Sequence, residues 1–345
     1  MRLGILTGGG DCPGLNAVIR AAVVHTIRTY EGQVLGFLDG WLGVLEGRTA
    51  ELTRDSIRGI LPRGGTILGT SRVNPVKASG GIETVRDTVR LHGLDGLLVC
   101  GGDGTLNAAA TLAEAGIPIV GLPKTIDNDV QGTDYSFGFD TALSIVVHAI
   151  DQLHSTAESH DRVIVVETMG RSVGWIAVCA SLAGGADVVL TPERPTSVTE
   201  VCDAIRLRRA RGIKFSIVVV AEGATFAPEA DGSVLEVPTR TDEFGRPRYG
   251  GVGGVLAHAI EQRTGIETRM VALGYVQRGG TPSAFDRLLG TRMGIHAVDL
   301  AARSEFNRLV SLQGTDISSV PLSVVRQGPR PVAPSLLEIA RVFSG

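Results

Sequence analysis

Aromatic side chains and net charge are both scarce in this chain of 345 residues. Aromatics make up 4% of the sequence, so there are few platforms on which nucleic-acid bases could stack. The formal net charge is −3, from 33 Lys and Arg against 36 Asp and Glu, which leaves no basic field to hold nucleic acid or an acidic membrane. We therefore expect neither as a partner, and an anion site has to come from a local cluster of cations.

Paired cysteines and long apolar runs are missing as well. The opening MRLGILTGGG enters a strand pattern without the apolar stretch of a signal peptide. The apolar run at 172–186 contains glycines and is too short to span a bilayer. We therefore expect a cytoplasmic protein. The four cysteines form no CxxC pair, which argues against a zinc site or a disulfide framework and predicts reduced, buried thiols at Cys12, Cys100, Cys179 and Cys202.

Glycine is the residue in excess. It accounts for 46 of the 345 residues, about one in eight, whereas its usual share is roughly 7%. Short apolar runs alternate with segments of helical periodicity, which predicts an α/β fold of mainly parallel sheets flanked by helices. The length favours two lobes or one large unit. Residues 227–250 break this rhythm, and their proline, glycine and charge predict an exposed excursion, such as a β-hairpin.

Glycine-rich or polar loops follow four of the apolar runs. In an open α/β sheet, ligands gather at the carboxyl ends of the strands, where such loops lie. Glycine turns that lead into helices expose backbone N–H groups that suit phosphate oxygens, although any one of them alone fits a tight turn equally well. The four loops are residues 7–14, 101–105, 123–129 and 169–171.

Carboxylates in two of these loops indicate a metal and a base. Asp103 lies among glycines in GGDGT, a poor way to hold an anion but a good one to hold Mg²⁺, which takes one or two carboxylates with waters and phosphate oxygens. Asp127 and Asp129 are two residues apart, so in an extended segment they share a face, and one can accept the proton of an attacking hydroxyl. The alternative for this pair is an Asx turn capped by its own side chains.

Cations near these loops complete the requirements of phosphoryl transfer, in which charge spreads over the transferred oxygens. Lys124, Arg72 and Arg171 lie in or next to the loops. Arg162, Arg269 and Arg278 flank apolar runs and suit a second anion, with surface salt bridges as the alternative. The sequence therefore predicts a Mg²⁺-dependent phosphotransferase.

Seven ordered motifs give the chain a resemblance to the 6-phosphofructokinase family, nearly continuously over residues 1–300. They are LTGGGDCPGLN, GGTILGTSR, GGDGT, PKTIDND, SHDRVIVVETMGR, VVVAEG and ETRMVALGYVQRGG. GGDGT alone also occurs in lipid and NAD kinases, but not with the other motifs. The resemblance implies two Rossmann-like lobes with the active site in the cleft between them. A donor and Mg²⁺ lobe would comprise 1–137 and 281–305, and a sugar-phosphate lobe 138–280 and 306–345.

The resemblance also implies roles for individual residues in making fructose 1,6-bisphosphate during glycolysis. Asp127 would deprotonate the 1-hydroxyl of fructose 6-phosphate, Asp103 would hold Mg²⁺, and Thr125 and Asp129 would contact the substrate and the metal shell. Arg171, with Arg72, would stabilise the transferring group. The donor site would comprise Gly10, Arg72, Gly102, Asp103, Gly104, Thr105 and Lys124.

The sugar site implied by the resemblance comes from the other lobe and from a neighbouring subunit. Met169, Gly170 and Glu222 would bind the sugar, together with Thr125, Asp127 and Arg171. Family members borrow two of the 6-phosphate ligands from a second copy, which implies a homotetramer or homodimer with shared active sites. The 6-phosphate ligands would be Arg162, Arg269, Tyr275 and Arg278, of which Arg162 and Arg269 are the borrowed pair.

Departures from the short bacterial ATP enzymes bear on the phosphoryl donor. Tyr275 stands where those enzymes carry His and Lys124 where they have Gly, and both resemble the pyrophosphate-using branch. The excursion 227–250 is also absent from the short ATP enzymes. Gly104 points the other way, because the pyrophosphate-using branch carries an aspartate there that takes the place of the α-phosphate. A blocking group excludes a donor outright, whereas a cation only adds affinity. We therefore predict ATP, with pyrophosphate as the alternative donor.

Two further functions fit the same motifs. One is activity on a related sugar phosphate such as sedoheptulose 7-phosphate, and the second is nucleotide binding by a regulator without catalysis. In the ATP enzymes an allosteric nucleotide site uses basic residues of the first helix. Arg20 and Arg54 match that site, but Val24 stands where a second helix arginine is expected, which leaves effector binding open.

Overall fold

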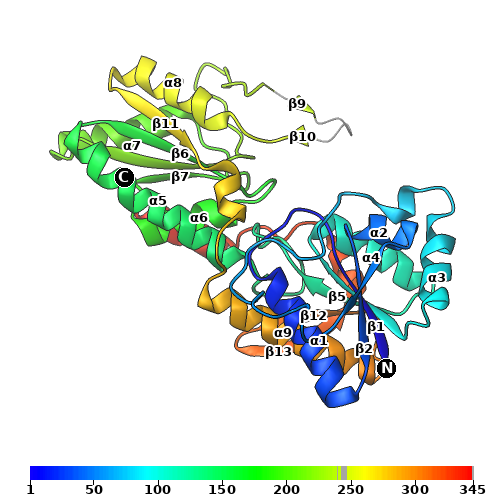
Figure 1. Cartoon of the computed structure of the whole chain (residues 1–345). Helices are drawn as coiled ribbons and strands as arrows, with labels where there is room; N and C mark the ends of the chain where they lie inside the picture. The colour runs from blue at the N-terminus through cyan, green and yellow to red at the C-terminus, as the bar shows by residue number, and fades with distance from the viewer. Residues whose placement is uncertain (239, 242–246, 344–345) are drawn as a thin grey trace. The chain divides into compact units, whose positions relative to one another are not determined.

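The computed structural model describes residues 1–238, 240–241 and 247–343, which form two compact units. The first unit comprises Met1–Thr141 and Arg278–Arg330, and the second comprises Ala142–Gln277 and Pro331–Gly345. Both are built on mainly parallel sheets with helices on their faces (Figure 1). The predicted α/β class with two lobes is therefore confirmed.

The sheet of the first unit is parallel in its centre and antiparallel at both edges. Its strand order is β13-β12-β5-β4-β1-β2-β3. The central strands are nearly continuous apolar runs because helices cover both faces of the sheet. The strands are β1 Arg2–Thr7, β2 Gln33–Phe37, β3 Thr49–Leu52, β4 Gly96–Gly101, β5 Ile119–Pro123, β12 Arg308–Gln313 and β13 Asp316–Pro321.

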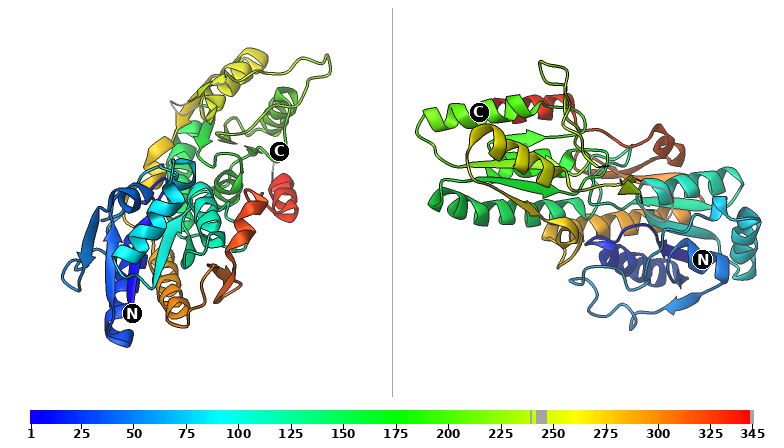
Figure 2. Two further views of the ribbon diagram at one scale, coloured as in Figure 1. Left: turned by 90° about the vertical axis from the view of Figure 1, so that its right-hand side faces the viewer. Right: turned by 90° about the horizontal axis from the view of Figure 1, so that it is seen from above.

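Helices α1 and α9 lie side by side in the first unit, where small residues allow a close approach (Figures 1 and 2). A Cβ added at Gly294 of α9 would lie 2.8 Å from the carbonyl oxygen of Val18 in α1, so glycine is required there. The helices of this unit are α1 Leu15–Tyr30, α2 Trp41–Glu46, α3 Gly81–Leu91, α4 Asp103–Glu114 and α9 Ala284–Ala302, with the 3₁₀ turns η1 Pro75–Lys77 and η3 Leu322–Gln327.

The second unit is built on an all-parallel sheet with the order β11-β6-β8-β7. Its strands are rich in valine, a β-branched residue that suits a buried parallel strand. Val165 and Val218 are fully buried in its core. The elements are α5 Phe139–Ser159, β6 Val163–Thr168, α6 Trp175–Gly184, β7 Val188–Leu190, α7 Val198–Ala210, β8 Ser216–Ala221, α8 Val252–Thr264, β11 Thr268–Ala272, η2 Gly274–Arg278 and α10 Pro334–Phe343.

The boundary predicted near the end of the chain is wrong. Residues 306–345 are expected in the second lobe, but β12 pairs with β5 and continues into the β13 hairpin, so residues up to Arg330 belong to the first unit. Burial explains the choice: Leu309 and Val310 are fully buried against the first unit. Of the end segment, only the part with α10 joins the second unit, where Val332 and Ala340 contact the α6 cluster.

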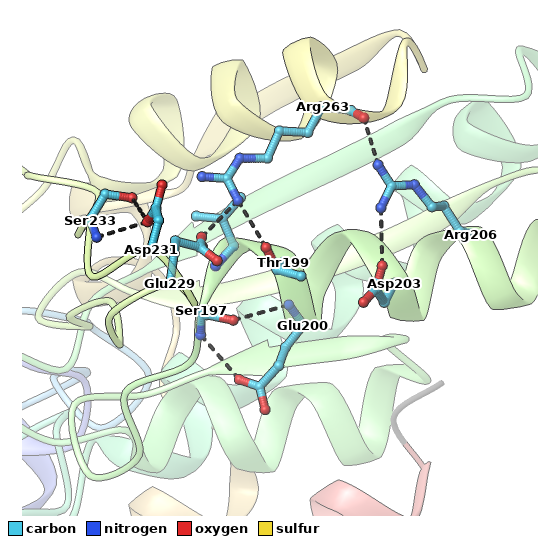
Figure 3. Close-up of polar contacts among 10 residues, drawn as sticks. Ser197, Thr199, Glu200, Asp203, Arg206, Glu229, Asp231, Ser233 and Arg263 are labelled. Carbon is cyan, nitrogen blue, oxygen red and sulfur yellow. Dashed lines mark hydrogen bonds and ion pairs between the residues drawn. The ribbon is translucent and has the colours of Figure 1, made fainter.

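The base of the predicted excursion 227–250 is anchored to α7 and α8 (Figure 3). Glu229 accepts the N–H of Val198, the first residue of α7, at 3.1 Å, and lies 2.7 Å from Arg263 of α8. Further along, β9 (Arg240–Thr241) pairs antiparallel with β10 (Pro247–Arg248), in agreement with a hairpin. Residues 239 and 242–246 of the predicted excursion lie outside the described part of the chain.

The described helices contain none that is both long and apolar enough to cross a membrane. The predicted thiols are largely confirmed, because Cys12, Cys100 and Cys202 are buried, while Cys179 is only partly so. Burial raises the pKa of the Cys12 thiol, and it raises that of Cys100 to about 12. No disulfide joins any of the residues that the structure describes.

Candidate active site

The first sheet has a topological switch point between β1 and β4. The chain runs from β1 to β2 on one side and from β4 to β5 on the other, while β1 and β4 are neighbours. In open α/β sheets ligands bind where the strand order reverses, outside the carboxyl ends. The predicted loops 7–14, 101–105 and 123–129 follow β1, β4 and β5 at this edge, which brings together residues of the first unit that were predicted to bind the donor.

The glycine loop after β1 contacts other segments that were predicted to form the donor site. The Gly9 N–H donates to the Ser71 carbonyl at 2.9 Å, which places the loop beside the exposed Arg72. A Cβ added at Gly10 would lie 2.7 Å from Arg278 Nη1, so the guanidinium would have to shift if this residue were not glycine. Arg278, predicted as a 6-phosphate ligand, therefore lies beside the glycine loop of the first unit.

Asp103 is the first residue of α4, directly after Gly102. A carboxylate in this position is favoured by the N-terminal end of the helix dipole. Its Oδ1 accepts a hydrogen bond from Asn107 Nδ2 at 2.8 Å. Its Oδ2 has no hydrogen bond or ion pair within the described residues, which leaves one carboxylate oxygen for a ligand.

Gly104 is exposed, and its backbone conformation does not demand glycine. No atom lies within 4 Å of a Cβ built at this position, and its φ is not in the left-handed region. A Cβ would therefore fit here without strain. Thr105, the next residue, is by contrast buried in the first turn of α4. Position 104 is thus free to vary with function, whereas its neighbour is constrained by packing.

Lys124 is buried at the end of β5, with 3% of its surface exposed. Its Nζ donates to the carbonyl oxygen of Gly10, so it joins the loop after β5 to the loop after β1. Burial lowers the pKa of this ammonium group, and the nearby Arg278 lowers it further. A cation held in this way is poised to meet an anion that approaches the glycine loop.

Asp127 combines a held and an open carboxylate oxygen. Thr125 Oγ1 donates to Asp127 Oδ2 over 3.3 Å and accepts the Asp127 N–H at 3.0 Å. Asp127 Oδ1 is buried, and no described residue makes a hydrogen bond to it. A buried carboxylate oxygen is costly without a partner, so this oxygen is suited to accept a hydrogen bond from a ligand.

The extended geometry predicted for Asp127 and Asp129 is wrong. Asn128 between them has a φ of +52°, in the left-handed region, so the alternation of an extended strand does not apply. The Asp127 N–H instead donates to Thr125 Oγ1, which forms an ST turn, whereas the alternative stated for this segment was an Asx turn. Asp127 and Asp129 are nevertheless both buried in the first unit, at 3% and 2% exposure.

The carboxyl ends of β6 and β8 bring the predicted sugar ligands together in the second unit. The Arg171 N–H donates to Glu222 Oε1 at 3.0 Å. Arg171 has a φ of +55°, which costs on the order of 1–3 kcal/mol in a residue with a Cβ and is typical of functional sites. Met169 and Gly170 lie between β6 and Arg171. This group therefore forms a constrained loop with one exposed guanidinium.

Gln277 is a residue of this site that the sequence reasoning missed. It is fully buried in η2, and its Oε1 accepts the Met169 N–H at 3.2 Å while its Nε2 donates to the Gly274 carbonyl at 3.1 Å. It thereby fixes the loop after β6 against the segment that carries Tyr275, whose side chain is 77% exposed. Its place inside the QRGG motif was the one sequence feature that could have indicated a role for Gln277 in this site.

Arg162 and Arg269 lie at the opposite end of the same sheet. Arg162 precedes β6 and pairs with Glu267 at 2.8 Å, and Arg269 contacts the same carboxylate. At about 3.3 Å per strand residue, β6 separates Arg162 from Met169 by on the order of 20 Å. One chain therefore does not bring these two arginines to its own Tyr275 and Glu222.

A basic pocket of about 270 Å³ lies between α1 and the turn at 54–59. It contains Arg20, Arg54 and Val24, the positions compared above with an allosteric nucleotide site. The structure adds two cations that the sequence comparison missed, Arg28 and Arg58, which line the same pocket. Positive charge is therefore present around Val24, although Val24 itself supplies none.

The metal-ligating atoms available at the start of α4 fit a Mg²⁺ ion that is held mostly by phosphate oxygens. Within residues 1–238, 240–241 and 247–343, no three His, Cys, Asp or Glu side chains gather closely enough to form a metal site. Mg²⁺ usually keeps several waters and takes one or two carboxylates together with substrate phosphates. The open Oδ2 of Asp103, next to the glycine loops, meets that requirement.

Comparisons with known proteins agree with this arrangement. The family model described as Phosphofructokinase matches residues 2–301. A pyrophosphate–fructose 6-phosphate 1-phosphotransferase of Streptomyces coelicolor is 52% identical over 100% of both chains. An ATP-dependent 6-phosphofructokinase 2 of the same organism is 49% identical over 94% of both chains. The crystal structure of Pichia pastoris phosphofructokinase in the T-state matches 99% of this chain and 36% of its own, at 31% identity and a TM-score of 0.83.

The relatives carry names with both donors, so overall identity does not separate them. The family itself is shown by the match along nearly the whole chain and by relatives near half identity. The resemblance seen in the seven motifs is confirmed by these matches. With its glycine loops, its acidic residues after β4 and β5 and its two mainly parallel sheets, the chain belongs to the phosphofructokinase family of phosphotransferases.

Proposed function

We propose that this chain transfers the γ-phosphoryl group of ATP to the 1-hydroxyl of fructose 6-phosphate. Family membership supports the reaction type and the acceptor, because the relatives are named for fructose 6-phosphate or as phosphofructokinases. In this proposal the first unit binds the donor and Mg²⁺, and the second unit binds the sugar phosphate. The residues at the carboxyl ends of the two sheets support that division.

Gly104 is the observation that carries the choice of donor. No atom lies within 4 Å of a Cβ built there and its φ is outside the left-handed region, so neither contact with a Cβ nor backbone conformation imposes glycine here. By the family resemblance, a carboxylate at this position would take the place of the ATP α-phosphate, and two like charges within a few ångströms repel strongly where water is scarce. Glycine leaves room for the nucleotide and adds no charge.

Asp127 is proposed to act as the general base. Its buried Oδ1 would accept the proton of the 1-hydroxyl while Thr125 holds Oδ2, so that the carboxylate keeps one orientation. Asp129, buried two residues further on, would contact the substrate and the metal shell. This division of labour uses the turn geometry of the loop rather than an extended strand.

Cations around the loops are proposed to hold the phosphoryl groups. Arg72 and Arg171 would stabilise charge on the transferring group, and buried Lys124 would neutralise the departing phosphate beside Gly10. When bound, Mg²⁺ neutralises charge on the phosphate oxygens of the donor. Asp103 would hold it through Oδ2, with Gly102 and Thr105 shaping the loop.

The 6-phosphate site is proposed to be shared between subunits. Tyr275 and Arg278 would come from one chain, while Arg162 and Arg269 would come from a neighbouring copy. The separation of the two arginines from the carboxyl end of their own sheet supports this arrangement. The protein would then be a homodimer or homotetramer, because each site is incomplete without a second chain.

The test is a donor screen on the purified protein and on Gly104→Asp, with fructose 6-phosphate as the acceptor. We expect the unmodified protein to turn over ATP, and Gly104→Asp to lose ATP turnover by at least about 100-fold because it adds a like charge at the α-phosphate. Thermal melts check that both proteins fold, as the open space at 104 predicts. Turnover of pyrophosphate but not of ATP by the unmodified protein would overturn the proposed donor.

Pyrophosphate is the second candidate donor, favoured by Lys124. Its buried ammonium beside Gly10 suits a departing phosphate in either reaction, and a relative that is 52% identical is named for pyrophosphate. The same screen with sedoheptulose 7-phosphate as the acceptor separates a change of sugar from a change of donor. A chain that binds ATP but turns over no acceptor would instead be a regulator.

A further inference from the structure

Asn107 makes an unusual set of contacts one turn after Asp103 in α4. Its Nδ2 lies 2.8 Å from Asp103 Oδ1, 3.0 Å from the Asp103 carbonyl oxygen and 3.4 Å from the Val325 carbonyl oxygen. An amide carries two N–H donors, so the two shorter contacts are satisfied together. One side chain therefore fixes both the carboxylate and the backbone of the same residue.

The chemistry of an amide suits this position. A neutral donor restricts the rotation of a carboxylate but leaves its negative charge intact. An arginine or lysine in the same place would pair with the carboxylate and compete with a divalent cation for it. With Oδ1 held by Asn107, the oxygen that has no hydrogen bond or ion pair within the described residues is Oδ2.

The segment that ends the first unit supports this face of α4. The Val325 carbonyl of η3 accepts the longer contact from Asn107, and the Val325 side chain is buried against the first core. Arg326 of the same turn donates to Thr111 at 3.1 Å and contacts Glu114 at 2.7 Å. The amide is therefore held between its own helix and a second element.

We propose that Asn107 is a positioning residue for the metal ligand: it orients the Asp103 carboxylate so that Oδ2 faces the divalent cation. The inference rests on the proposed role of Asp103, but it does not depend on whether ATP or pyrophosphate is the donor. Residues that orient a metal ligand usually affect metal affinity by about 10- to 100-fold when they are replaced.

The test separates the carboxylate contact from the helix contact. In Asn107→Ser the hydroxyl still reaches the carbonyl four residues back but is too short for Asp103 Oδ1. Mn²⁺ binding is followed by electron paramagnetic resonance, with ATP and, in a parallel series, with pyrophosphate, and without sugar phosphate. Binding of the same anions without metal is measured in EDTA. Asp103→Asn serves as the reference, and Thr111→Val as the control on the same helix.

We expect Asn107→Ser to weaken Mn²⁺ binding about tenfold or more, with the metal-free anion affinity unchanged. Asn107→Leu, which lacks any donor, should weaken it at least as much if it folds, and Thr111→Val should leave it unchanged. Wild-type Mn²⁺ affinity in Asn107→Ser, beside a loss in Asp103→Asn, overturns the role of Asn107 alone. Unchanged affinity in Asp103→Asn overturns the metal assignment itself, and Asn107 with it.

Discussion

Asp127 has one carboxylate oxygen held by Thr125 and one buried without a partner among the described residues. Replacing it with asparagine keeps the shape but removes the ability to take a proton. We expect Asp127→Asn to lower kcat by about 10²- to 10⁴-fold, with little change in KM for fructose 6-phosphate, measured by a coupled assay. Thr125→Val should have a smaller effect. Near-normal turnover of Asp127→Asn would remove this residue from the mechanism.

The candidate catalytic and metal-binding residues in the loops could be predicted from the sequence. The residues that hold them in position could not. Asp103 and Asp127 follow apolar strands, and such a place in an α/β protein indicates a site. Asn107 lies inside a helix, where its sequence does not distinguish a solvent-facing asparagine from one that holds a carboxylate. Gln277 likewise acts through a backbone N–H more than 100 residues away, a contact that only the fold creates.

Helices α5 and α9 begin around one buried carboxylate in the first unit. Asp286 accepts the N–H groups of Gly138 at 2.9 Å and Thr141 at 2.8 Å, and the Thr141 hydroxyl at 2.5 Å. Burial raises its pKa to about 6, against the lowering effect of these hydrogen bonds. The contact fixes the point at which the chain leaves the first unit.

Removing this carboxylate leaves three buried donors without an acceptor. Each unsatisfied group costs about 1–3 kcal/mol, so we expect Asp286→Ala to lower the free energy of unfolding by at least about 3 kcal/mol in urea titrations. The control is Asp87→Ala, which removes an exposed ion pair with Arg90 and should change it by less than about 1 kcal/mol. Equal effects of the two variants would contradict the structural role of Asp286.

The positions of the strands were easier to predict from the sequence than the strands with which they pair. Runs such as 163–166, at the start of β6, are apolar and β-branched, so their strand character follows from the sequence. The pairing of β12 was not predictable, because a six-residue strand with only three apolar residues fits the edge of either sheet. The choice depends on which core buries Leu309 and Val310, and on the β13 hairpin that follows.

At the scale of the whole molecule, the position of Arg162 at the amino end of β6 has a testable consequence for assembly. If sites are shared, Asp127→Asn and Arg162→Ala damage different halves of each site. Mixed oligomers should then regain activity in about a quarter of their sites, because a complete site needs one intact residue from each of two chains. Activity is measured after the two inactive variants are co-expressed.

Matched pairs of variants provide the control for this experiment. Asp127→Asn mixed with Asp103→Asn should regain nothing, since both residues belong to the same unit of one chain. If the first mixture also stays inactive although hybrid oligomers form, the sugar phosphate is bound within one chain. The arginines at the amino end of β6 and β11 would then need another role.

The discontinuity of the first unit affects how the protein emerges from the ribosome. β5 ends at Pro123, but its outer neighbour β12 begins only at Arg308. At about 5–20 residues per second, synthesis of the intervening chain takes roughly 10–40 s, during which β5 is an unpaired edge. An open strand edge is a template for pairing with other chains. All strands of the second unit's sheet are synthesised before β12 is. The unit whose synthesis begins first is therefore the last to complete its sheet.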